Sequence, residues 1–239
     1  GADGLTDGLI MNVRLVNPVM SATGANAGTL VGRLETGNIY KSSSTGGSVT
    51  GTTDVGGLIG FGGGGGVVRY SSANTDVTAV QYGGGFIGSC ALSVTDSYAS
   101  GNVTGGTEIG GIAGTQACAL YRVYTSGGTV SGTNNVGGLS GRMTAGGFSD
   151  SYSAGTVSGG GTIGGLLGSR SGGSFYDESY WDSTLSAGYS DVGNLGDVVG
   201  VTGTSSASMT SPATFVGWDY TLYWRQSTPG SLPTAINVD

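Results

Sequence analysis

Charged side chains recur two residues before several tyrosines, and they are the residues of this sequence best suited to acid–base chemistry. The position is occupied in turn by Asn38, Val68, Asp96, Arg122, Asp150 and Glu178. If the chain stacks on itself in register, Arg122 lies between Asp96 and Asp150, and clustered Asp and Arg are what a sugar-cleaving site would require. The chain has no histidine, however, which excludes Ser-His and Cys-His pairs. We therefore expect a surface salt-bridge ladder and no enzyme.

A second acidic group could bind a cation. The segment YDESYWD carries Asp177, Glu178 and Asp182, whose carboxylates are ligands that calcium accepts. Calcium-binding solenoids repeat a Gly-Asp nonapeptide, and no such repeat occurs in this sequence. A solvated turn is the simpler interpretation, so we predict no metal and no cofactor.

Short polar residues flank a recurrent valine and would point outward if the valine points inward. They form two ranks: Ser48, Asp76, Asn102, Thr129 and Thr156 in one, and Thr50, Thr78, Thr104, Ser131 and Ser158 in the other. Regular threonine ranks could bind ice, but these ranks are mixed. They favour hydroxyl ladders on a pleated, solvent-facing surface.

The elements that must position these residues repeat along the chain. Large apolar residues follow glycine pairs at steps of 28, 28, 26, 27 and 27 residues: Leu30, Leu58, Phe86, Ile112, Leu139 and Leu166. A valine precedes this residue by nine positions in five cases, whereas the distances to a tyrosine marker vary (Tyr40, Tyr70, Tyr98, Tyr124, Tyr152 and Tyr180). Insertions thus collect in two connections, as in a three-sided coil whose third corner must superpose.

Short alternating runs bounded by glycine predict strands, and no window has helical periodicity. We predict an all-β fold, a right-handed parallel β-helix of about six three-sided coils of 26–28 residues, over residues 1–180. In this fold the six large apolar residues form a core ladder, and Tyr124 also points inward.

Glycine pairs mark the invariant corner of each coil. We expect them to turn the chain with positive φ and to let neighbouring coils approach closely. The pairs are Gly56 and Gly57, Gly84 and Gly85, Gly110 and Gly111, Gly137 and Gly138, and Gly164 and Gly165.

The two cysteines, Cys90 and Cys118, fall in the same connection of adjacent coils. Rungs spaced by about 4.8 Å suit the Cα separation of a disulfide. A bond in an oxidising compartment and two buried thiols both fit this placement.

The period lapses from about Trp181, and residues 181–239 are predicted to be an irregular capping region. A short helical turn is expected at SASMT (206–210), followed by an aromatic plug over the last coil made of Phe215, Trp218, Tyr220 and Trp224. An exposed aromatic platform for sugars is the alternative. No comparable cap is evident at the N-terminal end, so either further coils precede it or its open edge pairs with another subunit.

Composition and net charge argue against two classes of partner, nucleic acid and a lipid membrane. The net charge is −7 with only eight Lys and Arg, which argues against nucleic acid, and no apolar run reaches the roughly 20 residues of a membrane span. Glycine accounts for 52 of 239 residues, yet the fixed period argues against disorder.

The words VGGLIG, IGGIAG, VGGLSG and IGGLLG, with DSYASGNVTG and DSYSAGTVSG, resemble the GLUG repeat. The first coil departs from the pattern at Ala27 and Thr29, and the coil of Phe86 departs from it at Gly83. The resemblance implies an extracellular β-solenoid of secreted or surface-anchored bacterial proteins, including adhesin-like exoproteins, and it implies no catalytic residues. We thus expect a non-catalytic structural protein on the bacterial cell surface, a rigid stalk, adhesin segment or self-assembling filament subunit that contacts another copy, a longer solenoid or a host or matrix glycan. A carbohydrate-binding or carbohydrate-processing β-helix is the alternative.

Overall fold

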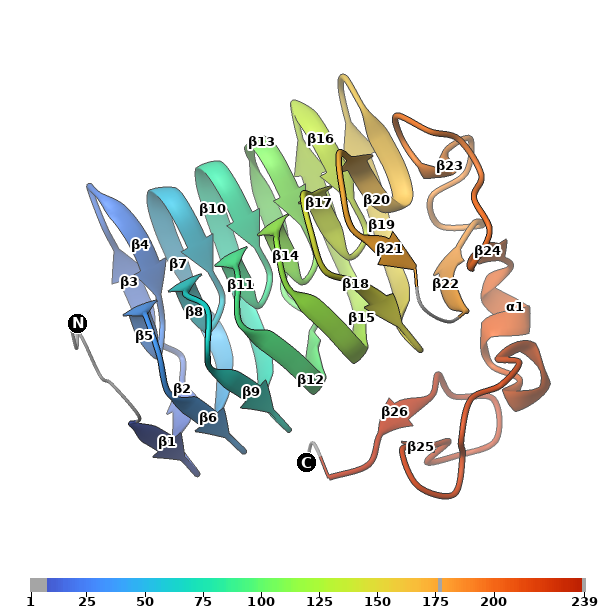
Figure 1. The fold of residues 1–239 in the computed structure, drawn as a ribbon, viewed down its shortest axis with the longest axis horizontal. Coiled ribbons are helices and arrows are strands. Elements are labelled where there is room, and N and C mark those ends of the chain that lie inside the picture. Colours follow the sequence, from blue (N-terminus) through green and yellow to red (C-terminus); the bar gives the residue numbers. More distant parts are fainter. Residues whose placement is uncertain (1–7, 176–177, 238–239) are drawn as a thin grey trace.

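The computed structural model describes residues 8–175 and 178–237, and these form a parallel β-solenoid of about seven turns (Figure 1). The turns stack along one axis, with β1–β5 at one end and β22–β24 and α1 at the other. The fold class is as the sequence predicts, with one turn more than the apolar markers indicate.

Each turn is built from short strands that pair in parallel with the next turn. The first two turns contain β1 (Leu9–Met11), β2 (Arg14–Val16), β3 (Val19–Ser21), β4 (Ala25–Gly28), β5 (Val31–Leu34), β6 (Asn38–Tyr40), β7 (Ser43–Gly56) and β8 (Ile59–Gly62). The next two contain β9 (Val67–Arg69), β10 (Ser72–Gly84), β11 (Ile87–Cys90), β12 (Ser93–Ala99), β13 (Val103–Gly110) and β14 (Ala113–Gln116).

The remaining turns carry the solenoid past the predicted cap boundary. They contain β15 (Ala119–Gly132), β16 (Asn134–Gly137), β17 (Ser140–Met143), β18 (Gly147–Ser149), β19 (Tyr152–Gly159), β20 (Ile163–Arg170), β21 (Ser174–Phe175), β22 (Ser179–Asp182), β23 (Ser190–Val192) and β24 (Val201–Thr204). β22 runs across residue 180, while the division into two domains stays a prediction.

The core ladder is continuous through the stack. Leu58, Phe86, Ile112, Leu139 and Leu166 are fully buried in one cluster, and Leu30 is packed against its end. Their backbones are linked as well, because each N–H donates to the carbonyl of the next member at 2.8–3.1 Å. Apolar burial and backbone pairing therefore follow the same column, so the turns stabilise one another.

The glycine pairs serve close approach and not left-handed turning. None of the ten corner glycines has positive φ, so that part of the prediction is wrong. A Cβ on Gly111 would lie 2.2 Å from the carbonyl oxygen of Gly138, and a Cβ on Gly85 would lie 2.2 Å from that of Gly111. Glycine is required because the backbone of the next turn occupies the space of a side chain.

Left-handed backbone occurs instead at two columns of mostly polar non-glycine residues. One is Asn26, Asp54, Tyr82, Glu108 and Asn135, and the other is Asn12, Lys41, Tyr70, Asp96, Arg122 and Asp150. Asn and Asp adopt this conformation more readily than other side chains, which explains part of both columns. The chain still bends at the second glycine of several pairs, such as Gly57 and Gly85, but it does so without positive φ.

A buried serine follows the second column at most turns: Ser42, Ser71, Ser97, Ser151 and Ser179. The Oγ of Ser97 accepts from the N–H of Ser71 at 3.2 Å and donates to the carbonyl of Thr95 at 2.8 Å. Each such hydroxyl satisfies backbone groups at the bend, where a buried unpaired group would be costly.

The tyrosine marker does not form a single column. Tyr98, Tyr124, Tyr152 and Tyr180 pair in register, but Tyr40 pairs with Arg69, and Tyr70 precedes the matching position by two residues. Nor does Tyr124 point into the core as predicted, since it packs in a separate cluster with the C-terminal segment. The bend before it reverses the expected alternation of inward and outward side chains.

Candidate functional site

The charged corner is an ion-pair cluster centred on the buried carboxylate of Asp96. Arg122 donates from Nε and Nη2 to the two carboxylate oxygens of Asp96 at 2.5 and 3.1 Å, and Arg69 lies 3.6 Å from the same carboxylate. Asp96 is only 3% exposed, so the predicted surface ladder is wrong in its burial. Asn38 and Val68 also lie outside this column, because they pair with Val67 and Ile39.

Asp96 raises the pKa of Arg122 through its hydrogen bond and its charge, although burial opposes the shift. The guanidinium also lies 4.2 Å above the ring of Tyr223, which comes from the C-terminal segment. With two guanidinium groups on one carboxylate, the arrangement binds turns to each other and to that segment. Asp150 lies close enough to add to the same shift in Arg122.

Two acidic residues of the segment YDESYWD, Glu178 and Asp182, lie in different surroundings. Asp182 is buried, and its Oδ1 accepts from the N–H groups of Thr184 and Leu185 at 2.9 and 3.0 Å, which fixes a turn. Glu178 accepts from Thr202 at 3.4 Å, and Asp177 lies outside the described residues. Within 8–175 and 178–237, no three Asp, Glu or Cys side chains gather as metal ligands would.

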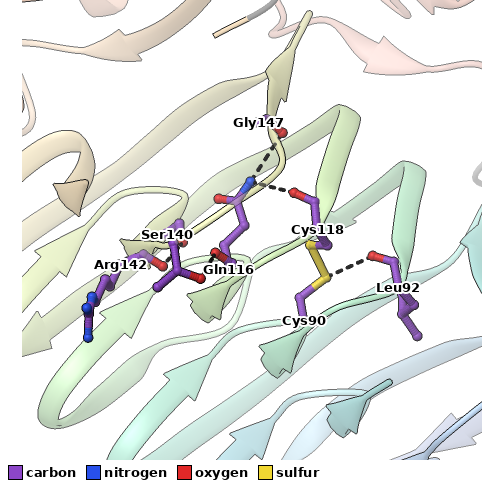
Figure 2. Close-up of a disulfide and its surroundings, with 8 residues drawn as sticks. Cys90, Leu92, Gln116, Cys118, Ser140, Arg142 and Gly147 are labelled. Atoms are coloured by element: carbon purple, nitrogen blue, oxygen red, sulfur yellow. Dashed lines mark hydrogen bonds between the residues drawn. A yellow bond between two sulfur atoms is a disulfide. The ribbon is translucent and has the colours of Figure 1, made fainter. Parts of the chain in front are cut away.

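Cys90 and Cys118 form a disulfide between neighbouring turns, with their Cα atoms 5.6 Å apart (Figure 2). Beside it, the buried amide of Gln116 donates to the carbonyls of Cys118 and Gly147 at 3.0 and 3.2 Å. The bond thus continues, in covalent form, the turn-to-turn links made elsewhere by hydrogen bonds.

The two polar ranks lie side by side as expected from the valine register. Thr50, Thr78 and Thr104 pair in sequence, followed by Ser131 and Ser158. In the neighbouring rank, Asn102 donates its N–H and its Nδ2 to Asp76 at 2.9 and 3.0 Å. Part of this face is therefore occupied by side-chain ladders between turns.

The C-terminal segment forms a strap along the side of the solenoid rather than a plug over its end. It comprises α1 (Ser206–Met209), the 3₁₀ turn Pro212–Thr214, β25 (Trp224–Arg225) and β26 (Thr234–Ala235), and it runs back beneath the turns toward β12 (Figure 1). The predicted helical turn is confirmed, but the placement of the plug is wrong.

The predicted cap aromatics bury a stack of outward tyrosines. Tyr98, Tyr124 and Tyr152 stack at centroid distances of 5.0 and 5.1 Å, and Phe215, Trp218 and Trp224 cover them, with Tyr220 partly buried alongside. The Tyr152 hydroxyl donates to the carbonyl of Pro233 at 2.7 Å. Burial raises the pKa of Tyr152, and more modestly that of Tyr180.

Trp181 is the aromatic residue that fills the last layer of the interior, a role the sequence reasoning missed. Its ring lies against the Cα positions of Gly165 and Gly203, and its Nε1 donates to Asp191 at 2.7 Å. Burial raises the pKa of Asp191, against the opposing hydrogen bonds from Trp181 and the Val198 N–H. The only available signal was the bulky residue at a position where earlier repeats have a small one, such as Ala99, Thr125 or Ser153.

Comparison with known proteins does not identify this chain beyond its fold class, a parallel β-solenoid. No protein-family model, no curated protein and no solved structure matches the chain. In the described part of the chain, no helix has the length and apolar character needed to cross a membrane.

Proposed function

We propose that this chain is a rigid, non-catalytic structural segment of an extracellular bacterial surface, built from GLUG-type repeats. It acts as a length of stalk, adhesin or filament. The observation that carries the proposal is the unbroken column from Leu58 to Leu166, in which apolar burial and backbone hydrogen bonds coincide over successive turns. Such a column resists bending and extension, because every turn is bonded to its neighbours on all sides.

Two further observations support the location and the lack of catalysis. The disulfide between Cys90 and Cys118 suits an oxidising compartment outside the cytoplasm. The most concentrated charged group, at Asp96, is buried and internally paired, which suits a structural role better than a catalytic one.

The carbohydrate alternative is less favoured because the aromatic side chains are covered. Trp224 is fully buried and Trp218 nearly so, whereas a sugar platform requires exposed rings. Immunogold labelling of producing cells, with a panel of polysaccharides tested for binding and cleavage, checks the proposal. We expect surface label and no turnover of any polysaccharide. Cytoplasmic label or sugar cleavage lost in Arg122→Met would overturn it.

A further inference from the structure

The strap, residues 206–237, is attached to the solenoid by side chains and not by backbone pairing. β25 pairs with β26 in a separate two-stranded sheet, whereas β1–β24 belong to one continuous sheet. Among the described residues, the backbone-to-backbone hydrogen bonds of the strap end within it or at Ser205, which precedes it. Backbone pairing therefore joins each turn to the next but does not join the strap to a described turn.

Side chains hold the strap through hydrogen bonds and a layer of aromatic rings. The hydroxyl of Tyr152 donates to the carbonyl of Pro233 at 2.7 Å, and the hydroxyl of Tyr180 accepts from the N–H of Val216 at 3.1 Å. The ring centroid of Trp218 lies 6.2 Å from that of Tyr152 and 5.8 Å from that of Tyr180. Tyrosines of successive turns thus form one face of the solenoid, and the strap covers it.

The strap is bound on one side only, and its buried polar groups are incompletely paired. A middle turn has a neighbouring turn on each side, whereas the strap leaves Val216 and Leu222 exposed to 68% and 63%. Within the described part of the chain, three buried polar atoms of the strap lack a hydrogen-bond partner: the Tyr220 hydroxyl, Trp224 Nε1 and Thr234 Oγ1. A buried polar group without a partner lowers the stability of the closed strap. Separating the strap should therefore cost less than separating two turns.

The strap also has hydrogen bonds of its own that do not depend on the solenoid. Oδ1 of Asp219 accepts from the N–H groups of Thr221 and Leu222 at 2.8 and 2.9 Å. The carbonyl of Asp219 accepts from the N–H groups of Tyr223 and Trp224, both at 3.1 Å, and β25 pairs with β26. These bonds hold the segment together when it separates, so we expect it to move as one body.

We infer that the strap is a lid, which opens as one unit while the solenoid stays folded and so exposes the tyrosine face. This face consists of the side chains that pair in register on successive turns: Tyr98, Tyr124, Tyr152 and Tyr180. In the closed state the strap covers these rings, and in the open state they form an apolar surface of the kind that contacts other molecules. The inference goes beyond the proposed structural role and does not depend on it.

Two buried alanines, each replaced by cysteine, separate opening of the lid from unfolding of the solenoid. Ala154, on β19, is 4% exposed and packs in one cluster with Met209 and Phe215 of the strap. Ala113, on β14, is fully buried in the core cluster of the solenoid and serves as the matched control. Iodoacetamide labelling without reductant, followed by mass spectrometry, reports each new thiol while the native disulfide stays intact. Circular dichroism verifies the fold of each variant.

We expect the thiol of Ala154→Cys to be labelled on the order of 100-fold faster than that of Ala113→Cys, because it requires only local opening. Equal rates would show that the strap separates only when the whole chain unfolds, and would overturn the inference. Labelling of Ala154→Cys at the rate of a free thiol would show that no closed state exists, and would overturn it as well. Neither result would refute the structural function, which surface labelling tests separately.

A second substitution tests whether the observed opening is that of the lid. Tyr152→Phe keeps the ring but removes the hydrogen bond to the carbonyl of Pro233. It should raise the labelling rate of Ala154→Cys about fivefold, the effect of losing one hydrogen bond, and leave that of Ala113→Cys unchanged. An equal rise at both positions would indicate general destabilisation of the solenoid and would contradict a separate lid.

Discussion

Alanine at Gly111 tests whether the glycine pairs are needed for close approach between turns. Its Cβ would lie 2.2 Å from the carbonyl oxygen of Gly138 and 2.6 Å from the Thr125 methyl group, and the first of these is backbone of the next turn. Inserting a methyl group into such a contact costs typically 1–3 kcal/mol, and a backbone partner places the expected cost near about 3 kcal/mol. For a chain of this size, the melting temperature should fall by about 6–12 °C.

Two control glycines separate close approach from backbone conformation. Gly64→Ala places a Cβ no nearer than 3.9 Å from its surroundings at a normal φ, and Gly127→Ala meets nothing within 4 Å but has φ of +74°. We expect no more than about 0.5 kcal/mol from the first and about 1–2 kcal/mol from the second. Thermal unfolding followed by circular dichroism gives the order of the three. If Gly111→Ala melts with Gly64→Ala, steric exclusion at the corner is not what selects glycine.

Three further outcomes follow from the contacts of the solenoid and its strap. Reduction of the disulfide, or replacement of both Cys90 and Cys118 by Ala, should lower the free energy of unfolding by about 3.5 kcal/mol for a loop of this length. The protein should therefore melt at a lower temperature in reducing buffer. Equal melting temperatures with and without reductant would contradict this prediction. Ser97→Ala should cost about 1–3 kcal/mol in thermal unfolding, because the Ser71 N–H loses its acceptor. Ser158→Ala, at a half-buried serine, should be close to neutral, and equal effects of the two substitutions would refute a role of the buried hydroxyl. Burial raises the pKa of Tyr152 above the unfolded value near 10, so its stabilisation is complete below about pH 10 and is lost as the pH rises from there through the higher folded pKa. Tryptophan fluorescence in an alkaline titration should report release of the strap in that range, and a constant signal up to pH 12 would argue against the buried tyrosine stack.

The core of the solenoid was predictable because its constraint is local and repeated. A glycine pair followed by a large apolar residue at constant distance from a valine identifies one corner, and stacking then aligns Leu58, Phe86 and Ile112 without further information. The proximity of Cys90 and Cys118 followed from the same register.

The tyrosine face and the strap were not predictable in this way. A left-handed residue at Arg122 shifts the alternation of the strand, so Tyr124 points outward although its spacing suggests a core position. Sequence periodicity does not reveal that shift, because Arg is not a typical left-handed residue. The strap has no repeat, and its position depends on contacts such as that of Arg122 with Tyr223, which join residues about a hundred positions apart.

The contrast between repeated and unrepeated parts also bears on where function resides. The core ladder recurs at every middle turn, whereas the ion pairs at Asp96 and the disulfide between Cys90 and Cys118 occur once each. A contact made only by the repeated features would be available at every turn and would give no defined register. Most of the exposed large apolar residues of the described chain lie at the ends or on the strap, as Val19 and Val199 do. We therefore expect association with a defined register to use features that occur once along the axis.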